Sequence, residues 1–479
     1  MKNTYDNIVI GGGIVGSAIA YELAKNGLNV LCISDSDGDF TSASFASGAM
    51  LGAFAEITHN KQKTADRIET EFRIKCAKSY DDYLAEISDK SDLSITSTKG
   101  TFIISNNAGK DDLVNLNFIQ EQAEYYSEPY EIVELKDVPS YNPHRMFRPS
   151  KIIYLPNEAS LNSNKLVISI RKAAINTGKV DWLNGKVEKI DTKSGRASGV
   201  KLLTGELITS PNIIIAAGYG SRLLVDEIGN ENLNLPVIKG GKGSSLLVST
   251  NIKFPNVIRT PNRDFACGTH VLQRDSDNIY IGATNRISDT PGEKAGVTLG
   301  ELHVQLHSAL HEINTELRTE NITKFNVGAR PLTTDGYPLI GRTKINGLYI
   351  ATGTYRNGVL MAPMIGKLIV DDILYNSSIS NPFLPELREK LLTDSKDDIK
   401  LIVKNGVRDL VSFIQEPHGL LPYKRTVELE SFIEKLILGL TVESDVNNKL
   451  KKHVNDFLKN PQLEAIPSLY YSLASDDKE

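Results

Sequence analysis

The sequence predicts a mixed α/β fold, in which a parallel sheet covered by helices is combined with a more antiparallel sheet and a helical C-terminal appendage. Three observations predict it. Asn7–Ile10 and Val30–Ile33 are short apolar runs on either side of an amphipathic stretch, which is the pattern of a strand, a helix and a second strand. Between residues 195 and 217 the pattern changes to short alternating strands. From about residue 397 glycines become rare and apolar residues recur at helical spacing.

Length and composition predict a globular protein of two or three domains. Of the 479 residues, 40% are hydrophobic and 24% are charged, and the net charge is −5. That charge provides no positive field for nucleic acid or anionic lipid. The three cysteines are too scattered for a disulfide framework or a cysteine metal site. With no signal-peptide pattern and no apolar run of roughly 20 residues, we expect a cytoplasmic protein without a membrane or nucleic-acid partner.

Gly11, Gly13 and Gly16 form a G-x-G-x-x-G pattern between the first strand and the first helix. In that setting Gly11 allows a tight turn, Gly13 lets a pyrophosphate approach the backbone, and Gly16 lets the helix pack closely on the strand. The free N–H groups of the helix start, at Ile14 and Val15, are suited to phosphate oxygens. The pattern therefore predicts a dinucleotide site. The alternative is a glycine-rich turn without a ligand.

The end of the second strand departs from the usual pattern. An acidic residue is expected there as a ligand of the adenosine ribose, but Ser34 occupies the position and Asp35 follows it. Either side chain could bind the ribose. Asp35 could equally be a solvated turn residue.

Three further segments carry a family resemblance: Ala49–Glu56, Gly328–Pro331 and Gly353–Gly358. Together with the glycine pattern they resemble the D-amino-acid oxidase superfamily of FAD-dependent oxidoreductases, and within it the glycine oxidases. The resemblance covers about residues 5 to 390. It implies non-covalent FAD, and no cysteine occurs in the last segment that would suggest covalent attachment.

The resemblance also implies the domain organisation. It predicts a GR2-type, Rossmann-like FAD-binding domain with an antiparallel-sheet substrate domain over the flavin. The FAD-binding domain is expected to comprise residues 1–95, 160–237 and 329–396, and the substrate domain residues 96–159 and 238–328. Residues 397–479 are expected to form the helical extension, which could mediate a homo-oligomer.

Two groups of residues are expected to bind FAD. By similarity, Ser42 and Ser44 lie near the pyrophosphate, Val187 contacts adenine and Ala217–Gly218 ends a strand beside the cofactor. The segment from Gly353 to Leu360 opens a helix whose N–H groups would stabilise the negative charge that develops on the reduced flavin; an ordinary helix start is the alternative. The full predicted set is Gly11, Gly13, Ile14, Val15, Gly16, Ser34, Asp35, Ser42, Ser44, Met50, Val187, Ala217, Gly218, Gly353, Arg356, Asn357, Gly358, Val359 and Leu360.

Arg330, Arg356 and His270 are the candidate catalytic residues. An arginine binds both oxygens of a carboxylate and keeps its charge, and Arg330 stands where the resembled enzymes place such a residue; a structural ion pair is the alternative. Arg356 could assist the substrate or orient its loop. His270 replaces the family's tyrosine, and could be a substrate ligand, a proton acceptor near neutral pH or a half-buried strand histidine. Asn285 replaces a methionine, so the pocket is more polar.

These residues predict an FAD-dependent oxidoreductase that oxidises the C–N bond of an amino acid or related amine by hydride transfer to the flavin, with O2 as acceptor and imine and H2O2 as products. The substrate is a small amine or amino acid, and no metal site is expected. The alternatives are a dehydrogenase of a 2-hydroxy acid or amine with another acceptor, and a tailoring oxidase for a carrier-, peptide- or tRNA-bound amino group. A flavin-bearing scaffold is the non-enzymatic alternative.

Overall fold

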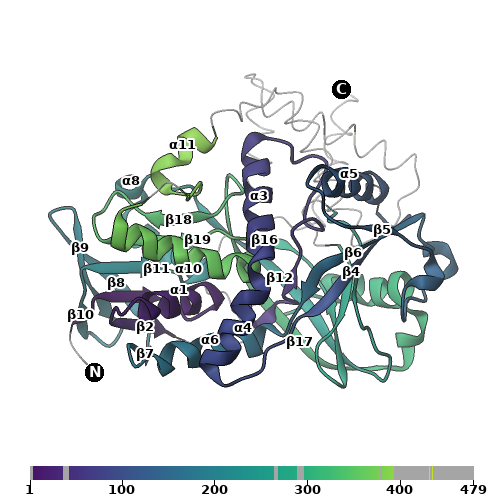
Figure 1. Ribbon diagram of the computed structural model, residues 1–479, viewed down its shortest axis with the longest axis horizontal. Helices are drawn as coiled ribbons and strands as arrows, with labels where there is room; N and C mark the ends of the chain where they lie inside the picture. The colour runs from purple at the N-terminus through teal and green to yellow at the C-terminus, as the bar shows by residue number, and fades with distance from the viewer. Residues whose placement is uncertain are drawn as a thin grey trace, which may run out of the picture.

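The computed structural model describes residues 4–35, 42–109, 111–263, 268–288, 296–377 and 380–392, together with positions 431 and 434. Within these residues the chain has the predicted mixed α/β architecture (Figure 1). Apart from those two positions, the predicted helical extension at 397–479 lies outside the described residues. Among the helices that are described, none combines the length and the apolar composition needed to cross a membrane.

One sheet of the described structure has six strands and includes both strands of the predicted strand–helix–strand unit. Its strand order is β18-β19-β11-β1-β2-β7, and all neighbours are parallel except β18 and β19. The strands are β1 (Asn7–Ile10), β2 (Val30–Ser34), β7 (Val180–Asn184), β11 (Asn212–Ile215), β18 (Leu339–Arg342) and β19 (Leu348–Thr352). Since β1 is central, the carboxyl ends of its neighbours β2 and β11 meet beside the glycine pattern.

Three helices cover one face of this sheet: α1 (Ile14–Lys25), α6 (Ser163–Asn176) and α10 (Gly358–Tyr375). Figure 1 shows α1 and α10 running next to each other over the strands. Their apolar side chains form one buried core with those of β1 and β2. Two more helices join this core, α3 (Thr64–Lys78) and α4 (Tyr80–Ser91).

A small antiparallel sheet covers the opposite face. It consists of β8 (Val187–Lys193), β9 (Arg196–Leu202) and β10 (Leu207–Thr209). With α7 (Ser221–Ile228) it encloses the second core, which contains the remaining side chains of β1 and β11. Strands β1, β2, β11 and β19 of this sheet are therefore covered on both faces, which explains why they are mostly apolar. The edge strand β7 is partly exposed.

A ten-stranded, mainly antiparallel sheet forms the other half of the described structure. Its strands are β3 (Met50–Leu51), β4 (Thr98–Ser105), β5 (Glu131–Ile132), β6 (Lys151–Ser160), β12 (Ile238–Ser249), β13 (Val257–Arg259), β14 (His270–Gln273), β15 (Asn278–Gly282), β16 (Arg286–Ser288) and β17 (Asn321–Thr333). The domain bounds remain a prediction. β3 and the last residues of β17 belong to this sheet although both lie in segments assigned to the FAD-binding domain.

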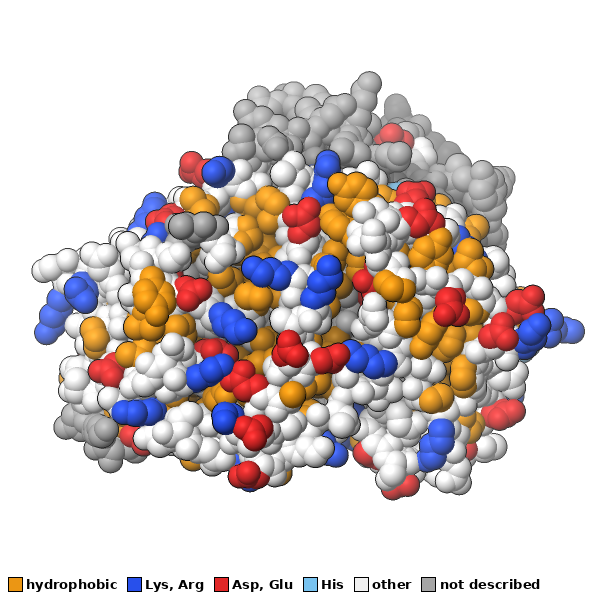
Figure 2. Space-filling model, in the orientation of Figure 1, with side chains coloured by type: hydrophobic (Ala, Val, Ile, Leu, Met, Phe, Trp, Pro, Cys, Tyr) orange, Lys and Arg blue, Asp and Glu red, His pale blue; other side chains and the backbone are white. Residues whose placement is uncertain are grey.

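The helices around the second sheet are α5 (Asp112–Tyr125) and α9 (Leu299–His307), with a π-helical turn, η4 (Ser308–Ile313), continuing α9. The remaining short α-helices are α2 (Ala43–Ala46), α8 (Asn230–Leu233) and α11 (Arg388–Leu391). On the face drawn in Figure 2, acidic and basic side chains are interspersed and no large patch of one sign forms.

Candidate functional site

The glycine pattern forms a tight crossing between β1, β11 and α1. Gly11 has a positive φ of 114°, and a Cβ there would lie 2.7 Å from the Cα of Ala217. A Cβ on Gly16 would collide with the carbonyl oxygen of Gly11, so α1 can approach β1 only with glycine at that position. Gly11 and Gly16 thus have structural reasons to be glycine that are independent of any ligand.

The start of α1 has the donor set that a pyrophosphate requires. Gly13 is the N-cap and has no side chain of its own to cap the helix, and the first turn contains no acidic residue. The backbone N–H of Ile14 donates to Oγ of Ser44 over 3.0 Å, which brings the predicted serine to the helix start. A Cβ at Gly13 would lie 3.1 Å from the same Oγ and would fill the space beside the helix end. These residues fit the phosphates of a dinucleotide.

The other residues predicted on the nucleotide side lie around the carboxyl ends of the strands. Ser34 is the last residue of β2, and Asp35 after it is exposed. Val187 begins β8, with its side chain in the core beneath β2. Gly218, just past β11, has a φ of 59°, and its carbonyl accepts a hydrogen bond of 3.0 Å from Thr352 of β19. Ser42 stands as N-cap of α2.

A second helix start without a capping side chain follows β19 at the same edge of the sheet, because β19 runs parallel to β11 and β11 runs parallel to β1. The helix α10 begins at Gly358 after the N-cap Asn357, without a capping side chain and without an acidic residue in its first turn. Gly353, with a φ of 74°, turns the chain out of β19 toward it. Tyr80 donates its hydroxyl to the carbonyl of Val359 over 2.9 Å and fixes the first turn, and Leu360 is buried beneath it. This geometry can stabilise negative charge.

Arg330 lies next to that helix start. The residue after it, Pro331, accepts a 2.7 Å hydrogen bond from the backbone N–H of Tyr355. Nη1 of Arg330 donates to the carbonyls of Gly241 (3.3 Å) and Thr284 (3.2 Å) and to Oδ1 of Asn285 (3.3 Å). Within the described ranges, the guanidinium of Arg330 makes no ion pair with a carboxylate and no other hydrogen bond. The guanidinium is positioned by neutral groups, and its charge is left without a counter-ion there.

Asn285 and Tyr355 connect the two candidate arginines. Nδ2 of Asn285 donates to the hydroxyl of Tyr355 over 2.7 Å, while its Oδ1 accepts from Arg330. The same hydroxyl accepts a 3.2 Å hydrogen bond from Nη2 of Arg356, whose guanidinium also lies 4.8 Å from the centre of the tyrosine ring. The structure thus brings Arg330 and Arg356 into one polar network.

Glu56 and Arg259 extend this network, and neither was predicted from the sequence as a site residue. Nη1 of Arg259 lies 2.7 Å from Oε1 of Glu56, and Nη1 of Arg356 lies 3.6 Å from Oε2. Burial alone would raise the pKa of Glu56, but the two arginines and a hydrogen bond from Asn262 hold it well below its usual range. Glu56 ends one of the resembling segments, whereas no pattern in the sequence singles out Arg259, a fully buried residue at the end of β13.

His270 is more buried than the sequence suggested. It is 3% exposed, and its ring stacks on Tyr280 with 5.7 Å between the ring centres. Burial lowers its pKa to about 3, and the charges of Arg259 and Arg330 act in the same direction. The imidazole is therefore neutral at neutral pH. This corrects the expectation of a half-buried histidine, and the environment does not suit a proton acceptor near neutral pH.

The remaining predicted residue, Met50, lies in β3 and packs against Tyr280 and Leu272. Lys242 is buried in β12, and its Nζ donates to the carbonyl of Gly296 over 2.8 Å. On the same strand, a Cβ on Gly241 would lie 2.8 Å from the ring of Tyr355, and one on Gly243 would collide with the guanidinium of Arg330. These two glycines make room for the site.

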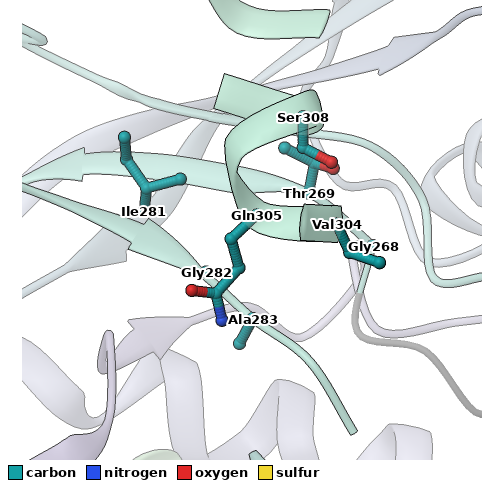
Figure 3. Close-up of a pocket in the computed structure, with 8 residues that line it drawn as sticks. All are labelled: Gly268, Thr269, Ile281, Gly282, Ala283, Val304, Gln305 and Ser308. Carbon is teal, nitrogen blue, oxygen red and sulfur yellow. The ribbon is translucent and has the colours of Figure 1, made fainter. Parts of the chain in front are cut away.

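The cavity drawn in Figure 3 lies elsewhere. It lies between α9 with its continuation η4, the residues just before β14 and the end of β15, and Val304, Gln305 and Ser308 line its helical side. Its volume of about 10 Å³ is room for about one water molecule. An amino acid does not fit there, so this cavity is not a candidate substrate position.

Comparison with known proteins gives a family match. Residues 6–372 match the model of the DAO family, described as FAD dependent oxidoreductase. Glycine oxidase of Bacillus subtilis (strain 168) is 27% identical over 395 residues, which are 81% of this chain and 98% of that enzyme. D-amino acid dehydrogenase of Rhizobium johnstonii is 24% identical over 409 residues, 76% of this chain and 94% of that one.

Solved structures agree with this match at the level of the fold. Glycine oxidase from Geobacillus kaustophilus superimposes with a TM-score of 0.69 at 22% identity, over 80% of this chain and 98% of the other. L-proline dehydrogenase from P. horikoshii superimposes with a TM-score of 0.67 at 18% identity, over 81% and 99%. The same architecture therefore occurs in both an oxidase and a dehydrogenase.

Proposed function

Because the chain belongs to the DAO family of FAD-dependent oxidoreductases, we propose that it oxidises the C–N bond of a small amino acid or N-substituted amino acid. Bound FAD supplies the electron acceptor: the substrate gives up a hydride from Cα and a proton from nitrogen to become an imine, and O2 finally takes both electrons and two protons to leave as H2O2. The observation that carries the proposal is Arg330, a positioned guanidinium without a carboxylate partner in the described residues.

In this proposal Arg330 binds the substrate carboxylate. Its Nη1 is fixed by two backbone carbonyls and Asn285, so Nε and Nη2 are the groups that meet the carboxylate. A fixed guanidinium loses little entropy on binding and orients the substrate Cα. A neutral His270 can exchange hydrogen bonds with the substrate, while its low pKa avoids placing a further positive charge beside Arg330.

The start of α10 and Arg356 serve the cofactor side of the same reaction. Gly358, Val359 and Leu360 present their N–H groups at the positive end of the helix dipole, where negative charge is stabilised as electrons arrive. Glu56 and Tyr355 hold Arg356, so its charge is oriented before the reaction. We propose that Arg356 acts near the flavin rather than as the carboxylate ligand.

Anaerobic flavin bleaching tests the proposal. The holoprotein would be mixed without oxygen with glycine, N-methyl amino acids, both enantiomers of larger amino acids, plain amines and 2-hydroxy acids, and the flavin absorbance followed. We expect bleaching by at least one α-amino carboxylate and slower or no bleaching by the matching amine without the carboxylate. Bleaching by hydroxy acids alone would overturn the proposal. Peroxide formation on readmitting air tests the O2 acceptor separately.

Arg330→Lys tests whether Arg330 binds the substrate carboxylate. We expect kcat/KM on the preferred amino acid to fall by about 100-fold or more, because a lysine cannot bind both oxygens in one plane. Arg196→Lys is the matched control, since Arg196 is exposed on β9. Equal rates for Arg330→Lys and the control would remove Arg330 from the site.

A further inference from the structure

The carboxyl end of β2 has a serine where dinucleotide-binding folds usually place an acidic residue for the adenosine ribose. Ser34 is the last residue of β2 and is 9% exposed. Its hydroxyl makes no hydrogen bond to any residue within the described parts of the chain. Asp35, the next residue, is exposed at the surface. Within the described residues, a largely buried serine therefore stands at the end of β2, where the usual pattern has a carboxylate.

Arg171 of α6 reaches the same place from the neighbouring helix. Its Nη2 donates to the carbonyl of Gly12, in the middle of the glycine pattern. A Cβ built on Gly12 would lie 2.9 Å from Nη2 of Arg171 and 2.9 Å from Cβ of Ser34. The guanidinium and the serine thus converge on one glycine, beside the ends of β1 and β2.

Two aromatic rings hold the guanidinium in this position. It lies 4.9 Å from the ring centre of Trp182 and 5.8 Å from that of Phe45. Trp182 is on β7, directly opposite Cys32 of β2. Burial raises the pKa of Cys32 to about 12, and the charge of Arg171 opposes that rise.

We propose that Arg171 and Ser34 together bind the adenosine ribose of FAD in place of the usual carboxylate. A carboxylate can only accept hydrogen bonds, whereas a guanidinium only donates and a hydroxyl does both. Arg171 therefore donates to a ribose oxygen, and Ser34 accepts from a ribose hydroxyl. The ribose would therefore contact the positive guanidinium of Arg171, whereas in the usual pattern it contacts a negative carboxylate.

Flavin release from the holoprotein tests the pair. Free FAD is measured by its fluorescence after serial dilution, which gives the Kd. We expect Arg171→Met and Ser34→Ala each to raise the Kd, Arg171→Met by about tenfold, the usual effect of losing a hydrogen bond from a charged group. Methionine keeps an apolar stem against Trp182. Lys165→Met removes a positive charge from an exposed position of the same helix and should leave the Kd unchanged.

Two further measurements test two alternatives: that Arg171 contacts a phosphate and not the ribose, and that Asp35 and not Arg171 binds the ribose. Full-length protein freed of flavin and reconstituted with FMN, which lacks the adenosine half, should bind FMN equally well with or without Arg171→Met. An equal loss of affinity for FMN and for FAD would overturn the proposal, because Arg171 would then act on a phosphate or on the fold.

Asp35→Asn should leave the Kd for FAD unchanged. A loss with Asp35→Asn and none with Arg171→Met would assign the ribose to Asp35 and would also overturn it.

Discussion

Two glycine-rich segments of the chain look alike in sequence and serve different purposes. In residues 11–16, a Cβ on the first or the last glycine would collide with backbone atoms of Ala216 or Gly11. In residues 240–243, a Cβ would instead collide mainly with side chains, those of Tyr219, Tyr355 and Arg330. The first segment allows backbones to cross beside a ligand, whereas the second makes space on a strand for the protein's own functional groups.

This difference matters because backbone and side-chain collisions have different consequences. A backbone crossing has no alternative arrangement, so a methyl group there affects the fold. A side chain can rotate away, so a methyl group there moves the functional group and leaves the fold in place. Different substitutions in the two segments should therefore change different properties: the stability of the fold, the rate of substrate turnover or the affinity for the cofactor.

Gly16→Ala should have the largest effect. Its methyl group would overlap the carbonyl oxygen of Gly11, and separating α1 from β1 would disrupt the core they share. We expect a loss of about 3 kcal/mol or more in stability, seen as little or no soluble yellow protein and a strongly lowered Tm. A stable, FAD-replete Gly16→Ala protein would show that α1 and β1 can separate without loss of the fold.

The first segment was predictable from sequence and the second was not, for a physical reason. Gly11, Gly13 and Gly16 lie within one strand–turn–helix unit, whose spacing is visible in the sequence, although Gly11 also meets Ala216 of a distant segment. The role of Gly243 depends on the pairing of β12 with β17, in which it stands opposite Gly328, some 85 residues away. No local pattern contains that register.

In the candidate site, too, features within contiguous segments were predictable and contacts between distant segments were not. The helix start at Gly358 and the position of Arg330 were predicted from contiguous segments that resemble a known family. The ion pair of Glu56 with Arg259 joins residues about 200 positions apart, and the contact of Arg171 with Gly12 spans 159 positions. Of the three alternatives for His270, the half-buried strand histidine was wrong about exposure, because the sequence does not reveal which neighbouring residues cover the imidazole.

Gly243→Ala should have the next largest effect, mainly on turnover and with a smaller loss of stability, because its methyl group would also lie 2.6 Å from the carbonyl oxygen of Thr284. Its methyl group would displace the guanidinium of Arg330, so the substrate carboxylate would lose its aligned partner. We expect kcat/KM on the preferred amino acid to fall by about 100-fold while the Kd for FAD stays the same. A parallel loss of FAD would contradict the assignment of this segment to the substrate side.

Gly13→Ala should affect the cofactor alone. A Cβ there would meet Oγ of Ser44 at 3.1 Å, a contact that a small rotation relieves, and Gly13 has an extended backbone that alanine can adopt. The methyl group would, however, occupy the space into which the pyrophosphate approaches. We expect the Kd for FAD to rise about tenfold or more with little change in the Tm of the flavin-free protein. An unchanged Kd would place the phosphates elsewhere.

Gly300→Ala should have the smallest effect and the opposite sign. Gly300 lies in the first turn of α9, outside both segments, with open space around the position of a Cβ and no positive φ. With neither kind of collision, only the lower helix propensity of glycine remains, so alanine should stabilise the protein by about 0.5 kcal/mol. A small rise in Tm with unchanged Kd and kcat/KM is expected. A loss of stability here would mean that glycine substitutions harm this protein for reasons other than the collisions described, and the contrast between the two segments would lose its basis.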